Sequence, residues 1–272
     1  MEARFSELLA DAARRGGAVG AFTCYNLETA LGVLQAAEER RRGVILLVSK
    51  QSFVSPGGEL FLTALAATAD AVSVPACVQL DHVSDLDAIE RAFEIGAGAV
   101  MADGSKLPFE ENLALVQAAA RFGELEAELG GIEGDEDVAA AVAAGALTDP
   151  DEAARLADEA APACLAVSIG NVHGRYRSAP ALDWPRLDAV AARTSVPLSL
   201  HGASGLPDED VRRAVSLGVL KVNVNTELRE AYLAVTRGRL DEVTGGARVL
   251  ELNSDQAAAV AEIAGRKLDM LG

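Results

Sequence analysis

The sequence predicts an α/β protein: a single-domain (β/α)8 barrel of the TIM type that spans residues 1–272. Three observations favour this fold. Eight short apolar runs typical of strands alternate with longer Ala-, Leu- and Glu-rich stretches that have helical spacing. A length of 272 residues is usual for one such barrel. Hydrophobic residues make up 50% of the chain, which is enough to fill a sizeable core.

The predicted strands lie, in order, at residues 17–26, 43–50, 75–82, 98–105, 125–130, 164–171, 197–202 and 219–226. Residues 27–42 (LETALGVLQAAEERRR) and 208–218 (DEDVRRAVSLG) have the periodicity of helices. Another helix is expected after Thr148, because Pro150 falls in its first turn and acidic residues follow. The Ala-rich stretch 137–146 is interpreted as a mobile loop or as part of a long excursion between a strand and its helix. A doubly wound open sheet is the alternative fold.

Charge and cysteine content exclude several classes of function. The net charge of −17 at pH 7 argues against nucleic acid or an anionic membrane as a partner. Cys24, Cys77 and Cys164 are odd in number and widely spaced, which indicates a reducing compartment without a disulfide framework. No signal-peptide pattern opens the chain, and no apolar stretch approaches 18 residues. A soluble, cytoplasmic protein is therefore expected.

The three histidines of the chain fall in similar places. His82, His173 and His201 each close or follow a predicted strand, beside Gly or Asp. In a barrel, such positions gather at the carboxyl-terminal face, where active sites are built. Three converging imidazoles suit a divalent metal, zinc above all, with one coordination position left open for a substrate. A single histidine is more often satisfied by a neighbouring carbonyl, but three at strand ends favour the metal site.

Several motifs together resemble one family. They are LDH (80–82), DGSKLPFEEN (103–112), EAELGGIEGDED (126–137), VSIGNVHGRY (167–176), LHGASG (200–205) and KVNVNTEL (221–228). In this order they are similar to the class II, metal-dependent ketose-bisphosphate aldolases, a family that includes fructose- and tagatose-bisphosphate aldolases. The resemblance covers about residues 17–235. It implies a barrel, usually with zinc, that reversibly cleaves a ketose phosphate to dihydroxyacetone phosphate and an aldehyde.

The resemblance also implies roles for single residues. His82, His173 and His201 would hold the zinc ion, which would stabilise the enediolate formed on cleavage. Glu128 matches a carboxylate near the metal, an alternative ligand, and periodicity places Glu126 on the same face of its strand. Asp81 matches the acid/base that takes the C4 hydroxyl proton, although a carboxylate that orients a histidine is the other interpretation.

Glu136 matches the carboxylate of a mobile loop that moves the proton on the dihydroxyacetone carbon. Its neighbours Glu133, Asp135 and Asp137 are rival candidates. In barrels, phosphate usually binds at backbone N–H groups and small side chains after strands 7 and 8. The expected substrate- and phosphate-binding residues are Asn26, Ser49, Gly174, Arg177, Gly202, Ser204, Asn223, Asn225 and Thr226.

Some positions depart from the family pattern, among them Thr23, Leu47, Val83 and Arg177. These departures leave the aldehyde half open: fructose bisphosphate, tagatose bisphosphate and a deoxy-keto-phosphogluconate of inositol breakdown are candidates. Related enzymes are commonly homodimers or larger, so a homo-oligomer is expected, and a monovalent cation could accompany the zinc. Two other functions remain: a Schiff-base aldolase that uses Lys221, and a non-catalytic sugar-phosphate-binding barrel.

Overall fold

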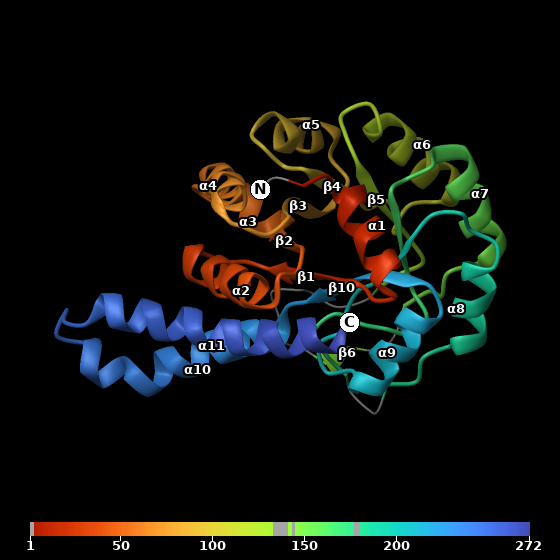
Figure 1. Cartoon of the computed structure of the whole chain (residues 1–272). Coiled ribbons are helices and arrows are strands. Elements are labelled where there is room, and N and C mark those ends of the chain that lie inside the picture. Colours follow the sequence, from red (N-terminus) through yellow and green to blue (C-terminus); the bar gives the residue numbers. More distant parts are fainter. Residues whose placement is uncertain (1–2, 133–140, 143–144, 177–179) are drawn as a thin grey trace.

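The computed structural model describes residues 3–132, 141–142, 145–176 and 180–272, and its centre is a closed parallel barrel (Figure 1). Around the barrel the strands follow the order β1-β10-β9-β7-β5-β4-β3-β2. Their bounds are β1 (Val19–Thr23), β2 (Val44–Ser49), β3 (Ala76–Val83), β4 (Ala99–Ala102), β5 (Leu125–Leu129), β7 (Cys164–Val167), β9 (Leu198–Leu200) and β10 (Val219–Val224). Each strand lies at one of the eight predicted runs. The closed barrel is thus confirmed, and the open sheet is not the fold.

Helices surround the barrel. They are α1 (Phe5–Arg15), α2 (Leu27–Arg40), α3 (Lys50–Val54), α4 (Gly58–Ala71), α5 (Leu86–Glu94), α6 (Phe109–Ala119), α7 (Pro150–Ala160), α8 (Trp184–Ala191), α9 (Asp208–Ser216), α10 (Thr226–Val243) and α11 (Val249–Met270). The helix expected after Thr148 is α7. Its N-cap is Asp149, whose carboxylate accepts the backbone N–H groups of Asp151 and Glu152, and Pro150 occupies the first turn.

A small parallel sheet lies outside the barrel and was not expected from the sequence. It consists of β6 (Ala141–Val142) and β8 (Arg175–Tyr176). Strand β6 belongs to the Ala-rich stretch, and β8 directly follows the HG motif at 173–174. The two segments that follow β5 and β7 therefore meet beyond the strand ends. Their pairing brings part of the long excursion next to the loop that carries His173.

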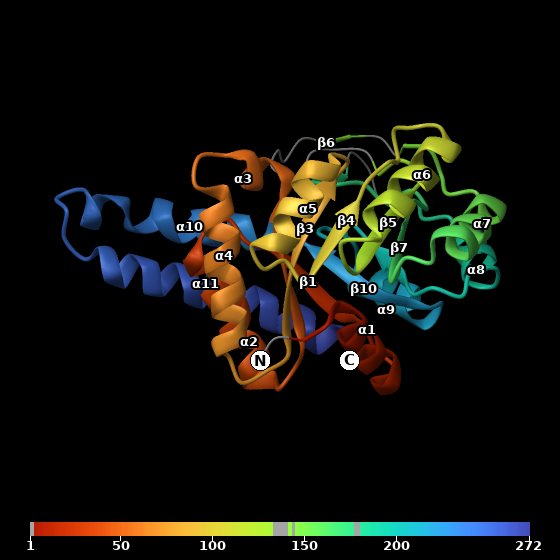
Figure 2. The same ribbon diagram turned by 90° about the horizontal axis from the view of Figure 1, so that it is seen from above.

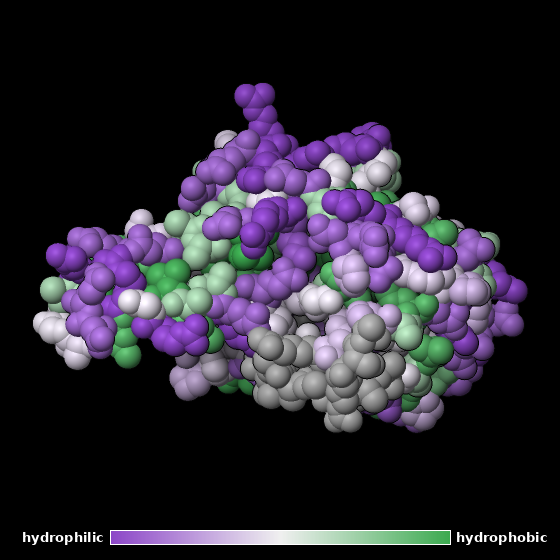
Figure 3. Space-filling model, turned by 90° about the horizontal axis from the view of Figure 1, so that it is seen from below, coloured by the Kyte–Doolittle hydropathy of each residue, from purple (hydrophilic) through white to green (hydrophobic). Residues whose placement is uncertain are grey.

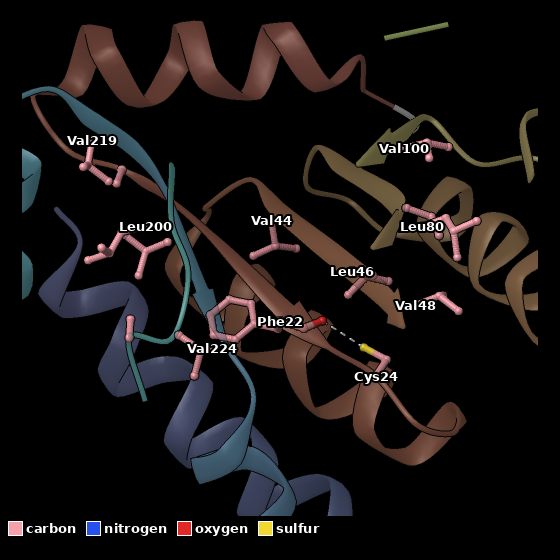
Figure 4. Close-up of a cluster of buried hydrophobic side chains, with 14 of the residues drawn as sticks. Phe22, Cys24, Val44, Leu46, Val48, Leu80, Val100, Leu200, Val219 and Val224 are labelled. Carbon is pink, nitrogen blue, oxygen red and sulfur yellow. Dashed lines mark hydrogen bonds between the residues drawn. The ribbon is translucent and has the colours of Figure 1, made fainter. Parts of the chain in front are cut away.

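Alternation along the strands divides the core into two parts. On β2, Val44, Leu46 and Val48 belong to the cluster that packs against the outer helices (Figure 4). Ile45 and Leu47 point the other way and pack with residues of α1. Helix α1 thereby closes the amino-terminal end of the barrel, and both chain termini lie near it (Figure 2). The opposite, carboxyl-terminal end stays available for a site.

Helices α10 and α11 form a hairpin that projects beyond the barrel (Figure 1, Figure 2). Helix α11 packs along α2 and along α10. Several large hydrophobic side chains of the hairpin are at least half exposed: Leu233, Leu240, Val249 and Leu250. In the described part of the chain, no helix combines the length and apolar character needed to cross a lipid bilayer.

Candidate metal centre and active site

The three histidines converge at the carboxyl-terminal end of the barrel. His82 lies on β3, His173 lies in the loop after β7, and His201 directly follows β9. Their ring centroids are 4.9, 5.0 and 5.8 Å apart. One nitrogen from each ring lies within 4.8 Å of the other two. His173 and His201 are buried and His82 is partly buried. The predicted convergence is thus present, and the cluster can hold a metal ion.

A β-bulge turns His82 into this cluster. Consecutive residues of a regular strand point to opposite faces, yet Asp81 and His82 both reach the barrel interior. His82 has a φ of 55°, in the left-handed region, and the register of β3 against β4 shifts between Leu80 and Val83. A left-handed non-glycine residue costs about 1–2 kcal/mol, and such strain is typical of functional sites.

Carboxylates fix the protons of two of the imidazoles. His82 Nδ1 lies 2.9 Å from Asp103 Oδ2, and His201 Nε2 lies 2.9 Å from Glu126 Oε1. An ionised carboxylate only accepts hydrogen bonds, so each of these nitrogens carries the proton. The remaining nitrogens, His82 Nε2 and His201 Nδ1, are 3.2 Å apart. Without a metal, a proton on His82 Nε2 joins the two nitrogens as a hydrogen bond; a metal ion that replaces this proton would meet a lone pair from each ring. The donor set fits a metal ion.

The electrostatic surroundings of His82 also favour positive charge. Burial lowers the pKa of an imidazole, but the carboxylates of Asp81, Asp103 and Glu128 outweigh burial and raise the pKa of His82 well above its usual value. His173 behaves in the opposite way: burial and the two neighbouring imidazoles lower its pKa well below the usual value. His173 is therefore a neutral imidazole, the form that binds a metal.

Six of the predicted phosphate-binding residues line one pocket beside His173. They are Gly174, Gly202, Ser204, Asn223, Asn225 and Thr226. Thr226 opens α10, so N–H groups of a helix terminus lie at this pocket. Ser204 Oγ accepts the backbone N–H of Asn225 at 3.2 Å, which ties the loop after β9 to the end of β10. The pocket is contiguous with a more open one lined by Tyr176, Gly205 and Glu227, among others.

Asp81 lies fully buried at the end of β3. Its Oδ2 accepts the side-chain N–H of Asn223 at 3.3 Å. Its Oδ1 has no hydrogen-bond partner among the residues that the structure describes. The neighbouring strand β2 places Ser49 opposite Asp81. Asp81 thus has one carboxylate oxygen free to exchange a proton with a bound molecule.

The other predicted site residues are not part of the described lining of the pocket beside His173, or they fall outside the described ranges. Asn26 caps α2, where its Oδ1 accepts the N–H of Thr29 at 2.9 Å, and its amide donates to Tyr232. Ser49 caps α3. Neither is among the described lining of the pocket beside His173. Glu128 Oε2 lies 3.3 Å from His82 Nδ1, the nitrogen on the side away from His201. Glu136 and Arg177 fall outside the described residues, as do the three rival acids Glu133, Asp135 and Asp137.

Several residues of the site carried no predicted role. Asp103 accepts a hydrogen bond from His82 Nδ1, and Ser105 Oγ donates to the carboxylate of Asp103 at 2.6 Å. Tyr176 Oη donates to the carbonyl of Gly202 at 3.0 Å, and Asn171 donates to the carbonyl of His201 at 3.1 Å. Asp103 begins the DGS sequence at the end of the predicted strand 98–105, directly after β4 ends at Ala102. That position is the signal by which Asp103 could have been found.

Comparison with known proteins agrees with this geometry. Residues 3–272 match the model of the family "Fructose-bisphosphate aldolase class-II". The YdjI aldolase from Escherichia coli K12 is 31% identical, with a TM-score of 0.88, over 100% of this chain and 98% of that one. A protein assigned as a fructose-1,6-bisphosphate aldolase from Coccidioides immitis is also 31% identical, with a TM-score of 0.87, over 98% and 96%.

A fructose-bisphosphate aldolase from Campylobacter jejuni shares the fold, with a TM-score of 0.80 at 21% identity over 99% of this chain and 95% of that chain. The family match covers nearly the whole chain. The matches to the two relatives above 30% identity cover almost the full length of this chain and of each relative. Enzymes of this class depend on a metal ion, and the chain has a cluster of side chains able to hold one. This chain belongs to the class II fructose-bisphosphate aldolase family and is an aldolase, a carbon–carbon lyase.

Proposed function

We propose that this enzyme is a zinc-dependent aldolase that reversibly cleaves a ketose phosphate or bisphosphate to dihydroxyacetone phosphate and an aldehyde. The observation that carries the proposal is that a possible metal site and a possible phosphate site lie side by side. The three-histidine cluster adjoins a pocket of small and amide side chains, since His173 belongs to both. A metal and a phosphate bound at these places would grip the two ends of one dihydroxyacetone phosphate unit.

His82, His173 and His201 are the proposed zinc ligands. Ligand nitrogens at about 2.0–2.1 Å from a tetrahedral zinc ion are about 3.3–3.4 Å apart, close to the 3.2 Å between His82 Nε2 and His201 Nδ1. Three protein ligands leave a position for substrate, as in catalytic zinc sites. When bound, the ion supplies Lewis-acid polarisation of the substrate carbonyl.

The pocket at the ends of β7, β9 and β10 would bind the phosphate. Gly174 and Gly202 have no side chain, so backbone N–H groups can approach phosphate oxygens closely. Ser204 and Thr226 add hydroxyl donors, and the start of α10 adds a partial positive charge. These neutral donors allow a strongly acidic protein to bind an anion. They also fix the distance between the phosphate and the reacting carbons.

Two carboxylates would move the protons. Asp81 has the available Oδ1 described above, and it lies beside the histidine cluster, so it is placed to take the C4 hydroxyl proton in cleavage. For the proton on the dihydroxyacetone carbon, the sequence resemblance favours Glu136. The order of the two transfers follows from the chemistry: C4–O deprotonation accompanies bond cleavage, and the carbon is protonated afterwards.

The surroundings of Lys221 disfavour a Schiff-base mechanism. Its ammonium group is fully buried, 2.7 Å from Glu126 Oε2 and 2.6 Å from Asn223 Oδ1. Burial lowers the pKa of a lysine, but the charges of Glu126 and Asp81 outweigh it and raise the pKa of Lys221. A nucleophilic lysine must be neutral and must reach the substrate carbonyl. Lys221 meets neither requirement.

The assembly is proposed to be a homodimer or a larger homo-oligomer. Figure 3 shows hydrophobic patches among the polar residues of the projecting hairpin. Leu250 is 83% exposed there, and Leu233 and Leu240 are each 54% exposed. Grouped apolar side chains on a projecting element are typical of a protein interface. A second copy of the chain would cover them.

Metal removal tests the proposed function. Protein treated with a strong chelator should lose cleavage of fructose or tagatose 1,6-bisphosphate, measured as released dihydroxyacetone phosphate. Added Zn2+ or Co2+ should restore it. Borohydride in the presence of substrate should leave the activity intact, because no imine forms. Activity that survives complete removal of the metal, or covalent trapping at Lys221 by borohydride, would contradict the proposal.

A further inference from the structure

Lys221 occupies the centre of a buried polar network inside the barrel. It lies on β10 with no solvent exposure, above the apolar layer that α1 closes. Its ammonium group contacts two side chains that lead to different parts of the site, Glu126 at 2.7 Å and Asn223 at 2.6 Å. A buried charge pair contributes little net stability compared with apolar side chains of the same volume. The pair therefore calls for a role other than stability.

The first connection runs through Glu126 to His201. Glu126 Oε2 accepts hydrogen bonds from Lys221 and from Gln79, each at 2.7 Å. Its Oε1 accepts from Ser199 Oγ and from His201 Nε2. Four donors on one buried carboxylate leave it little freedom to rotate. Because the carboxylate only accepts, it holds the proton of His201 on Nε2 and leaves the Nδ1 lone pair facing His82.

The second connection runs through Asn223 to Asp81. An ammonium group only donates hydrogen bonds, so Asn223 must turn its Oδ1 toward Lys221. Its amide nitrogen then points to Asp81 Oδ2 at 3.3 Å and to His201 Nδ1 at 3.2 Å. In the flipped orientation the amide oxygen would face the carboxylate of Asp81, which is repulsive. Lys221 thus selects the amide orientation that supports Asp81.

We propose that Lys221 is a positioning residue that organises the metal-binding and proton-transfer groups together: it fixes His201 through Glu126 and orients Asn223 toward Asp81. This inference rests on the proposed function, in which His201 binds zinc and Asp81 moves a proton. Lys221 touches neither the metal nor the substrate. Its removal should therefore impair zinc binding and turnover. Of the residues that line the phosphate pocket only Asn223 loses a contact, so substrate binding should change much less than zinc binding or turnover.

Two variants test this inference. Lys221→Met removes the ammonium group at similar side-chain length. The double variant Lys221→Met/Glu126→Gln removes both charges, so it leaves no unpaired buried carboxylate. It can therefore be measured in place of the single variant if the single variant fails to fold. Ile45→Val, which trims the apolar layer without touching the network, is the control for a general loss of packing. A cooperative thermal unfolding transition is required of each variant as the test that it is folded.

The readouts are the Zn2+ dissociation constant from chelator competition, the visible spectrum of the Co2+-loaded protein, and kcat and KM at saturating zinc. Both Lys221 variants should bind Zn2+ about 10–100-fold more weakly than wild type, and their Co2+-loaded forms should have a different visible spectrum from the wild-type form. Their kcat should fall at least about tenfold, while KM stays within about threefold of wild type. Ile45→Val should match wild type in all of them. If a folded Lys221 variant matches wild type in zinc affinity and kcat, the inference is wrong although the proposed function stands. If wild-type protein itself binds no zinc, both are wrong.

Discussion

Gly202 lies so close to Val172 that a β-carbon on Gly202 would stand 2.0 Å from the carbonyl oxygen of Val172. Gly202 also has a φ of 65°, which non-glycine residues rarely adopt. The loops after β7 and β9 therefore approach each other backbone to backbone, directly beside the proposed phosphate pocket. The glycine is required by this contact as well as by its conformation.

The first prediction compares Gly202→Ala with Gly205→Ala. Gly205 has a similar φ of 86°, but a β-carbon there would meet only Tyr176 Cδ2, at 3.8 Å. Gly205→Ala should lose about 1–2 kcal/mol of stability from backbone strain and keep the wild-type KM. Gly202→Ala should lose about 1–3 kcal/mol more from steric overlap. It should also raise KM for the phosphorylated substrate about tenfold, equivalent to ~1.4 kcal/mol of binding. Urea unfolding and steady-state kinetics measure both effects, and equal behaviour of the two variants would contradict the close-approach argument.

The second prediction concerns the bulge at His82. Asn tolerates the left-handed conformation better than most residues, but its amide is not a usual zinc ligand. His82→Asn should therefore keep the metal-free melting temperature within a few degrees of wild type, while Zn2+ binding weakens at least about 100-fold. His82→Ala should lose zinc equally and be less stable than His82→Asn by about 1 kcal/mol. Zinc affinity of His82→Asn within tenfold of wild type would remove His82 from the ligand set.

The barrel and the histidine cluster follow from features that the sequence shows directly. Parallel strands buried on both faces read as nearly continuous apolar runs, and carboxyl ends of barrel strands gather at one face. Three histidines at such ends are therefore expected at one face, although His82 reaches the cluster only through the bulge of β3. Periodicity likewise placed Glu126 and Glu128 on the same face of β5, and both side chains lie inside the barrel.

Partners across the barrel could not be predicted in the same way. Periodicity assigns a residue to a face, but the pairing of Glu126 with Lys221 depends on the register of two strands that are not neighbours. The bulge that turns His82 inward depends on how β3 meets β4. Asn26 and Ser49 show a different difficulty. A side-chain oxygen after a strand can cap the next helix or bind a substrate, and the residue type is the same for both.

The third prediction concerns the hairpin of α10 and α11. If a second copy of the chain covers its leucines, Leu240→Ser/Leu250→Ser should shift the protein toward monomer, because each buried leucine contributes about 1.5–3 kcal/mol to an apolar interface. Leu60→Ser is the control, since Leu60 is 76% exposed on α4 rather than on the hairpin. Light scattering during size-exclusion chromatography gives the mass of each species. A wild-type monomer at micromolar concentration would contradict the proposed assembly, and an unchanged oligomer of the double variant would place the interface elsewhere.

The last prediction separates the two proton transfers. Aldol condensation first removes a proton from the dihydroxyacetone phosphate carbon and then delivers one to the new C4 oxygen. Asp81 is buried in a strand beside the histidine cluster and is held by Asn223, so it should serve the C4 oxygen. Glu136 belongs to a Gly-containing loop sequence, GGIEGDED, and is proposed to serve the carbon.

Exchange of the dihydroxyacetone phosphate proton with solvent, measured by NMR without aldehyde, reports the carbon step alone. Glu136→Ala should nearly abolish this exchange, whereas Asp81→Ala should retain much of it and lose net cleavage. Each variant should lower turnover by about 10²–10⁴-fold, as for a positioned acid or base, with zinc content unchanged. Asp135→Ala is the matched control from the same loop and should exchange at the wild-type rate. If Glu136→Ala exchanges normally and Asp135→Ala does not, Asp135 is the carbon base, and the mechanism keeps the metal site and Asp81 with a different partner.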